Sequence, residues 1–244
     1  MKKLLSLALC AAAATTFAAD EITLGNVGVT AITLPAGQKN TIIAASFKDF
    51  ATGGDISVSN LVKTTNLDPG DKIMLYTAKN TYSAWVLGNN GAWQKAEKTY
   101  TVGSDGVATV DEGEASDTTT VKIGTGLWIV RKDPTEAAEI ALYGSIADAK
   151  STTTAAGAWN LIGNAGQVSF NAFEGAVGDQ IVMVADNGAL RTYNFKAGAD
   201  KGWYYVTYEG NKGTNNYVPP AVAPGQGFWY YTSTAKTLVW SDGN

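Results

Sequence analysis

The residues best suited to acid–base or metal chemistry in this sequence are its carboxylates. The sequence contains no histidine, and its single cysteine, Cys10, lies close to the N-terminus. Ser-His-Asp and Cys-His catalysis and zinc binding by thiolates therefore have no candidate residues. A glycosidase can work with two carboxylates alone, but such a pair normally lies in an aromatic-lined cleft, and most acidic residues here fall in expected turns. We expect a protein that is not an enzyme and that needs no cofactor.

Two Gly-Asp pairs are the most prominent candidate acidic sites. Gly70-Asp71 and Gly178-Asp179 each precede an apolar run, where a catalytic or calcium-binding carboxylate could stand. Pro69 favours a turn instead, in which the Asp accepts hydrogen bonds from nearby backbone amides. An acidic group with no defined calcium-loop spacing comprises Asp105, Asp111, Glu112, Glu114 and Asp117. We interpret the pairs as turns and the group as a solvated loop, so no metal site is predicted.

Short strands are the elements that must position these residues. The chain has 27 glycines, many threonines and few long helix formers, a composition that favours strands and turns. The runs 73–77, 181–185 and 227–232 are rich in β-branched or aromatic residues and are bounded by turn signals. Asn90-Gly91 and Asn187-Gly188 predict hairpin turns, because these residue types accept a positive φ at little cost. The predicted fold class is therefore all-β.

The same sequence elements occur twice in one order. The matched pairs are Gly70-Asp71 with Gly178-Asp179, Trp93 with Trp203, Gly124-x-Gly126-x-Trp128 with Gly225-x-Gly227-x-Trp229, 22–25 with 140–144, and 37–42 with 157–162. This order predicts two tandem antiparallel β-sandwich or barrel-like domains related by internal duplication, at 19–135 and 136–244. Segment 140–143 also resembles 237–240, so one kind of strand can end one copy and begin the next. We expect the paired tryptophans to be core residues.

The paired Gly-Asp and Gly-x-Gly-x-Trp elements carry a wider likeness. Together with Val27-Gly28-Val29 and Leu34-Pro35-Ala36-Gly37, they resemble uncharacterised secreted bacterial proteins built from duplicated β units. The likeness covers most of the chain, although its motifs are short and structural. It implies export and a β fold, and it carries no activity, cofactor or catalytic residue.

Tyrosines that follow Trp203 are the candidate ligand-binding residues. Tyr204 and Tyr208 correspond to polar or charged residues after Trp93, which indicates that this strand partly faces water. Residues four apart share one face of a strand and lie about 13 Å apart. Because an aromatic ring can lie flat on the apolar face of a sugar, Tyr204 and Tyr208 are candidate carbohydrate-binding residues. The alternative is that they cover an interface between the domains.

The N-terminus is typical of a secretory signal peptide. Lys2 and Lys3 precede an apolar run at 4–14, which is shorter than the ~20 residues that span a bilayer. Thr16 and Ala18 are suitable small residues before the cleavage point, so we expect residues 1–18 to be removed, with cleavage after 18 or 19. Cys10 is removed with them. The remaining chain should have no disulfide and no transmembrane anchor, and should be secreted, periplasmic or on the cell surface.

Net charge limits the partners of the processed chain. Without Lys2 and Lys3, the 18 basic residues become 16 against 22 acidic ones, a net charge of −6. This balance opposes binding to nucleic acid or anionic membranes, which depends on dense Lys and Arg patches. The expected partners are other surface or matrix proteins or polysaccharide. We therefore expect a structural or interaction protein of the cell surface or extracellular matrix, with a carbohydrate-binding module as the alternative.

Overall fold

The computed structural model is nearly all β, with antiparallel pairing throughout its described strands. The structure describes residues 27–63, 66–79, 81–102, 108–112, 119–147, 150–185, 187–198 and 201–242. The expected signal peptide and the side chains of the acidic group lie outside the described residues. No helix within these ranges is long and apolar enough to cross a membrane. The all-β, antiparallel fold class predicted from the sequence is confirmed.

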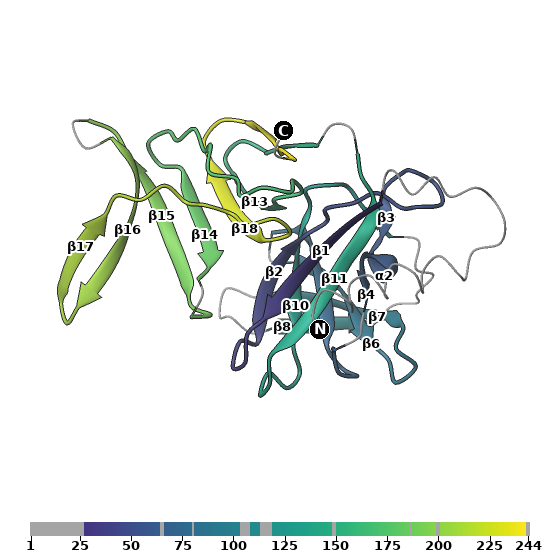
Figure 1. Cartoon of the computed structure of the whole chain (residues 1–244). Coiled ribbons are helices and arrows are strands. Elements are labelled where there is room, and N and C mark those ends of the chain that lie inside the picture. Colours follow the sequence, from purple (N-terminus) through teal and green to yellow (C-terminus); the bar gives the residue numbers. More distant parts are fainter. Residues whose placement is uncertain are drawn as a thin grey trace, which may run out of the picture.

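The first half of the chain forms a large sheet covered by a small one (Figure 1). The large sheet has the order β2 (Asn40–Ala44), β10 (Gly126–Val130), β5 (Lys72–Ala78), β6 (Thr81–Leu87), β7 (Trp93–Val102) and β8 (Ala108–Glu112). The small sheet has the order β1 (Val27–Leu34), β11 (Ala138–Ser145) and β4 (Val62–Lys63). A two-stranded pair and a single helical turn complete it: β3 (Ile56–Ser57), β9 (Thr120–Val121) and α2 (Val58–Leu61). We call residues 27–147 the first unit.

The second half also has a six-stranded sheet and a smaller covering sheet, and it lies beside the first half in Figure 1. Its large sheet has the order β13 (Ala158–Gly163), β18 (Gly227–Thr232), β14 (Gln180–Val184), β15 (Leu190–Lys196), β16 (Gly202–Glu209) and β17 (Lys212–Asn216). Its small sheet pairs β12 (Ser151–Thr153) with β19 (Thr237–Val239). We call residues 150–242 the second unit. The strands of the two large sheets correspond one to one in this order.

Each unit has its own core between the large and small sheets. In the first unit, Leu34 of the small sheet shares a buried cluster with Ile73 and Trp85 of the large one. In the second unit, Leu238 shares a cluster with Ile181 in the same way. In each unit the small sheet covers one face of the large sheet, which gives a sandwich-like arrangement. The small sheet does not cover the opposite face of the large sheet.

The pairing of β11 with β1 assigns β11 to the first unit. This strand pairs with β1 over its whole length, from Val27 opposite Ser145 to Leu34 opposite Ala138. The strand β19 pairs with β12 in the corresponding small sheet. The likeness of 140–143 to 237–240 therefore reflects equivalent positions, since each of these strands is the last strand of its unit along the chain and pairs with the first strand of that unit in the small sheet.

Strand registers align the two large sheets residue by residue. Trp128 lies opposite Ile42, and Trp229 lies opposite Leu161. With the two tryptophans taken as equivalent, Ile42 corresponds to Leu161. The sequence match that paired Ile42 with Ile162 is therefore wrong by one residue. The correction matters because a shift of one residue moves every side chain to the other face of a sheet.

Candidate functional site

The carboxylate of Asp71 holds a turn. Its Oδ2 accepts a hydrogen bond from the amide of Asp68 at 3.0 Å, and its Oδ1 accepts one from the amide of Lys132 at 2.7 Å. The side chain thus ties the turn before β5 to the segment after β10. Gly70 beside it has a φ of 100°, a left-handed conformation that favours glycine. The interpretation of this Gly-Asp pair as a turn is confirmed.

Asp179 makes the same two contacts in the second unit. Its Oδ2 accepts from the amide of Ala176 at 3.0 Å, and its Oδ1 accepts from the amide of Ser233 at 3.1 Å. The carboxylate also pairs with Lys236, whose Nζ lies 2.9 Å from Oδ2. The hydroxyl of Tyr230 donates to the same oxygen at 3.4 Å. The second Gly-Asp pair is therefore also a turn.

The Asp179–Lys236 pair is held in its charged form. Burial raises the pKa of Asp179, but the hydrogen bonds from Lys236, Ala176 and Ser233 outweigh it and leave the pKa below its usual value. Burial lowers the pKa of Lys236, yet the hydrogen bond to Asp179 and the proximity of Tyr230 leave it raised. Neither group exchanges a proton near neutral pH, so the pair acts as a structural clamp. Among the described residues, no cluster of three or more carboxylates is placed to hold a metal ion.

A close backbone contact joins the two units. Ala44 N donates to Gly225 O at 2.7 Å, and Gly163 N donates to Gly124 O at 2.9 Å. In the aligned sheets Ala44 corresponds to Gly163, and Gly124 to Gly225, so these two hydrogen bonds are the same contact made in both directions. We call this contact the seam, which comprises residues 43–45, 124–126, 162–164 and 225–227.

The seam is reciprocal in its other contacts too. Ile43 forms a β-bridge with Gln226, and Thr125 forms one with Ile162. These bridges also exchange equivalent residues between the units. Reciprocity of this kind is the rule at a two-fold interface between identical subunits. The two units therefore meet as a pseudo-symmetric pair within one chain.

Glycines let the backbones approach at the seam. A Cβ atom at Gly163 would lie 2.3 Å from the Cβ of Ala44, and one at Gly126 would lie 2.8 Å from the carbonyl oxygen of Ile162. A Cβ at Gly227 would meet the backbone of the first unit at 2.6 Å. Because no side chain fits at these positions, the seam fixes how the units are oriented.

Trp128 and Trp229 lie beside the seam, on the faces of their sheets opposite the cores. The prediction that they are core residues is only partly right: Leu127 and Phe228 next to them are buried in the cores of the units, whereas both tryptophans are half-buried and pack against a smaller buried cluster of Ile42, Leu161 and Val184. The ring of Trp229 packs edge-on against Tyr76 of the first unit, with centroids 4.9 Å apart. The other matched pair, Trp93 and Trp203, is buried in the two cores as predicted.

The candidate tyrosines both lie on β16 but in different surroundings. Tyr204 is half-buried and lies opposite Asn194 of the neighbouring strand β15, whereas Tyr208 is 72% exposed. Pairing between β15 and β16 ends at Tyr204, and from Tyr205 onward β16 pairs only with β17. Figure 1 shows the β16–β17 hairpin diverging from β15. The strand carries Tyr208 away from the sheet, and a shallow groove of about 390 Å³ opens between the diverging strands.

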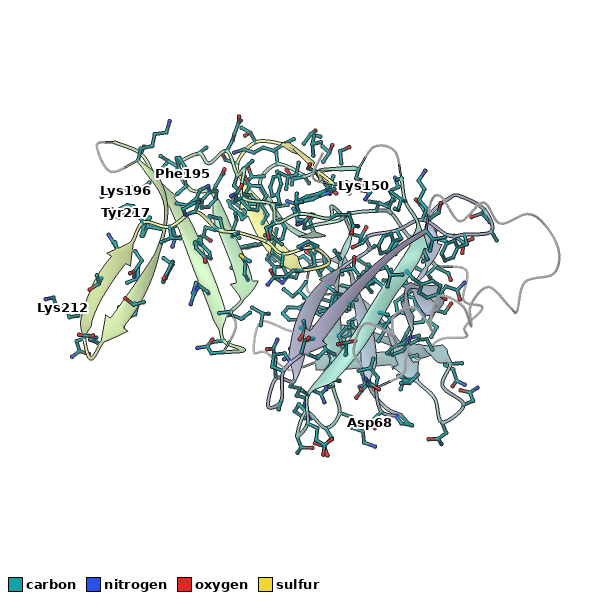
Figure 2. The ribbon with its side chains drawn as sticks, viewed as in Figure 1. Asp68, Lys150, Phe195, Lys196, Lys212 and Tyr217 are labelled. Atoms are coloured by element: carbon teal, nitrogen blue, oxygen red, sulfur yellow. The ribbon has the colours of Figure 1, made fainter. Side chains whose placement is uncertain are left out.

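These tyrosines do not cover the contact between the units. The strand β16 is separated from β18, which forms part of the seam, by β14 and β15. The ring of Tyr204 instead packs against Tyr217 of its own unit, with centroids 5.7 Å apart. Figure 2 shows Tyr217 beside Lys196 at the side of the second sheet far from the first unit.

A row of side chains crosses the outer face of the second sheet, and sequence reasoning found only one member of it. Each member lies opposite the next on the neighbouring strand, except Tyr217, which directly follows β17. We call these residues the outer row, which comprises Trp159, Tyr231, Gln180, Asn194, Tyr204 and Tyr217.

Side chains of the outer row contact their neighbours. The rings of Trp159 and Tyr231 have centroids 5.6 Å apart. In the middle of the row, the Gln180 Nε2 donates to the Asn194 Oδ1 at 3.0 Å. The row is thus an aromatic pair, an amide pair and a second aromatic pair on one face of the sheet.

Comparison with known proteins found no family model, no curated protein and no solved structure that matches this chain.

Proposed function

We propose that this chain is a secreted, non-enzymatic structural or interaction protein of the cell surface or extracellular matrix. The observation that carries the proposal is the seam. Units of one chain usually move relative to each other unless their interface prevents it. Here, reciprocal backbone hydrogen bonds and glycine contacts fix the two units, as suits a protein that holds or presents a binding surface.

The two units descend, in this proposal, from tandem duplication of one β unit. Equal strand order, equivalent Asp71 and Asp179 turns, and equivalent indole contacts support this origin. The indole nitrogen of Trp93 donates to Val62 O at 3.2 Å, and that of Trp203 donates to Phe173 O at 3.1 Å. The pairing of β11 with β1 favours a boundary after residue 147.

Carbohydrate binding is the second candidate function. The outer face of the second sheet favours it, because Tyr204 is part of a row of aromatic and amide side chains on that face. Polysaccharide and other surface or matrix proteins are therefore the proposed partners.

Fractionation of the native bacterium with an antibody to this chain tests the main proposal. We expect the protein in the envelope or the medium, and we expect chemical cross-linking of intact cells to join it to envelope components. Recovery from the cytosol alone, or from the envelope without any cross-linked partner, would contradict the proposal.

A further inference from the structure

The outer row has no aromatic counterpart in the described part of the first unit, although the strand order there is equivalent. The first sheet's registers place Asn40, Val130, Lys72, Val86 and Gln94 opposite one another in the equivalent positions. In particular, Asn40 occupies the place of Trp159, and Gln94 the place of Tyr204. The sheet therefore folds without aromatic residues in these positions, and their presence in the second unit calls for a reason other than the scaffold.

Their exposure agrees with a role at the surface. Trp159 is 38% exposed and Tyr217 is 44% exposed, and the four residues between them are half-buried. A large aromatic side chain left in water carries a cost that burial against a ligand removes. The row has the composition of a binding surface, in which aromatic rings supply contact area and a few polar groups supply orientation.

From this arrangement we propose that the outer row binds a neutral polysaccharide chain that lies across the strands. The inference rests on the second candidate function and gives it a site and a ligand class. The rings of Trp159, Tyr231 and Tyr204 offer flat surfaces to the apolar faces of sugar rings. The amides of Gln180 and Asn194 offer both donors and acceptors to sugar hydroxyls.

The length and charge of the row define the ligand further. Tyr231 and Tyr204 are three strands apart, which is about 14 Å at the usual spacing between strands. This span exceeds one monosaccharide and favours a chain. Lys196 adds one positive charge at the end of the row, where its Nζ donates to the hydroxyl of Tyr217 at 3.3 Å. The part of the row from Trp159 to Tyr204 has no charged member at neutral pH, and it therefore suits a neutral ligand.

The direction of the chain follows from the divergence of β16. A ligand lying along β16 from Tyr204 to Tyr208 would leave the sheet where pairing with β15 ends. A ligand lying across the strands keeps contact with residues on five of them. Tyr208 is therefore outside the proposed site and serves as a control.

Affinity electrophoresis of the processed protein in gels containing mixed-linkage β-glucan, xylan, galactomannan or hydroxyethylcellulose tests the proposal. At least one of these neutral polymers should retard the wild-type protein. Trp159→Ala and Tyr204→Ala should each weaken retention about tenfold, equivalent to about 1.4 kcal/mol. The controls Asn40→Ala and Gln94→Ala, at the equivalent positions of the first unit, and Tyr208→Ala should retain wild-type binding.

Melting temperatures identify variants whose folding has changed. If Trp159→Ala melts earlier than the wild type, Tyr217→Ala at the far end of the row replaces it and should show the same loss of retention. Retention of wild-type protein by none of the four polymers would overturn the inference. So would equal retention of row variants and controls, or a loss confined to Tyr208→Ala. The surface-protein proposal survives any of these results, because fractionation and cross-linking test it separately.

Discussion

Adding one methyl group at Gly163 should destabilise the whole protein, because the seam has no space for it. The new Cβ would lie 2.3 Å from the Cβ of Ala44 and 2.7 Å from its Cα. Carbon atoms in favourable contact are about 3.5–4.0 Å apart, so the backbones of the two units must separate. Overpacking of this kind costs about 1–3 kcal/mol. We expect Gly163→Ala to lower the free energy of unfolding by about 2 kcal/mol.

The equivalent residue in the first unit provides the matched partner for this test. Ala44→Gly removes the Cβ that the new methyl would meet, at a cost of its own of about 1–2 kcal/mol from the lost methyl burial and the added chain entropy. In the double variant the shortest approach disappears, although the new methyl group still lies close to the backbone of residue 44. The double variant should therefore lose about 1 kcal/mol less unfolding free energy than the sum of the losses in the two single variants.

Urea unfolding, monitored by tryptophan fluorescence, measures these free energies. The comparison requires that the dependence of the unfolding free energy on urea concentration is the same in the wild type and the variants. Gly213→Ala in β17 is the control, since its added Cβ would approach only side chains. The reasoning fails if Gly163→Ala unfolds within about 0.5 kcal/mol of the wild type, the range of an ordinary surface change. It also fails if the effects of the two substitutions simply add.

Three further predictions concern the cores, the Asp179 clamp and export. Trp93→Phe should cost about 1–2 kcal/mol more than Trp85→Phe in urea unfolding, because it leaves Val62 O without its donor, whereas the Trp85 indole nitrogen has no hydrogen-bond partner among the described residues. Asp179→Asn should lower the melting temperature at pH 7. The lowered pKa of Asp179 and the raised pKa of Lys236 make their stabilisation complete between about pH 4 and 10, so the difference from wild type should shrink below pH 4; a constant difference down to pH 2 would refute the clamp. Mass spectrometry of the exported protein should show a start at residue 19 or 20, and an intact initiator methionine would contradict the signal peptide.

Local signals allowed the turns and the fold class to be predicted. A Gly-Asp pair before an apolar run favours a turn for local reasons, because the glycine accepts a positive φ and the aspartate accepts hydrogen bonds from nearby backbone amides. The roles of Asp71 and Asp179 could therefore be interpreted without tertiary information. The sequence did not allow us to predict which face of each strand packs in the core. Leu127 and Trp128 are adjacent and both apolar, and alternation alone does not say which of the two faces the small sheet covers.

The outer row was largely invisible in the sequence because it depends on register. Tyr231 and Gln180 are neighbours only because β18 pairs with β14, which are far apart in the chain. Trp159 was hidden by the match that aligned 37–42 with 157–162 one residue out of register. A comparison of the copies by strand alternation, with Ile42 set against Leu161, could have found it.

Native-state hydrogen exchange at the seam tests most directly whether the two units form one body. The amides of Ala44 and Gly163 donate across the seam, so both should exchange only with global unfolding, at the same free energy as the core amides of Ile73 and Ile181. The equivalence of the two seam amides also predicts equal protection for them. Exchange of either seam amide orders of magnitude faster than the core amides would show that the units separate while folded, and would contradict the account.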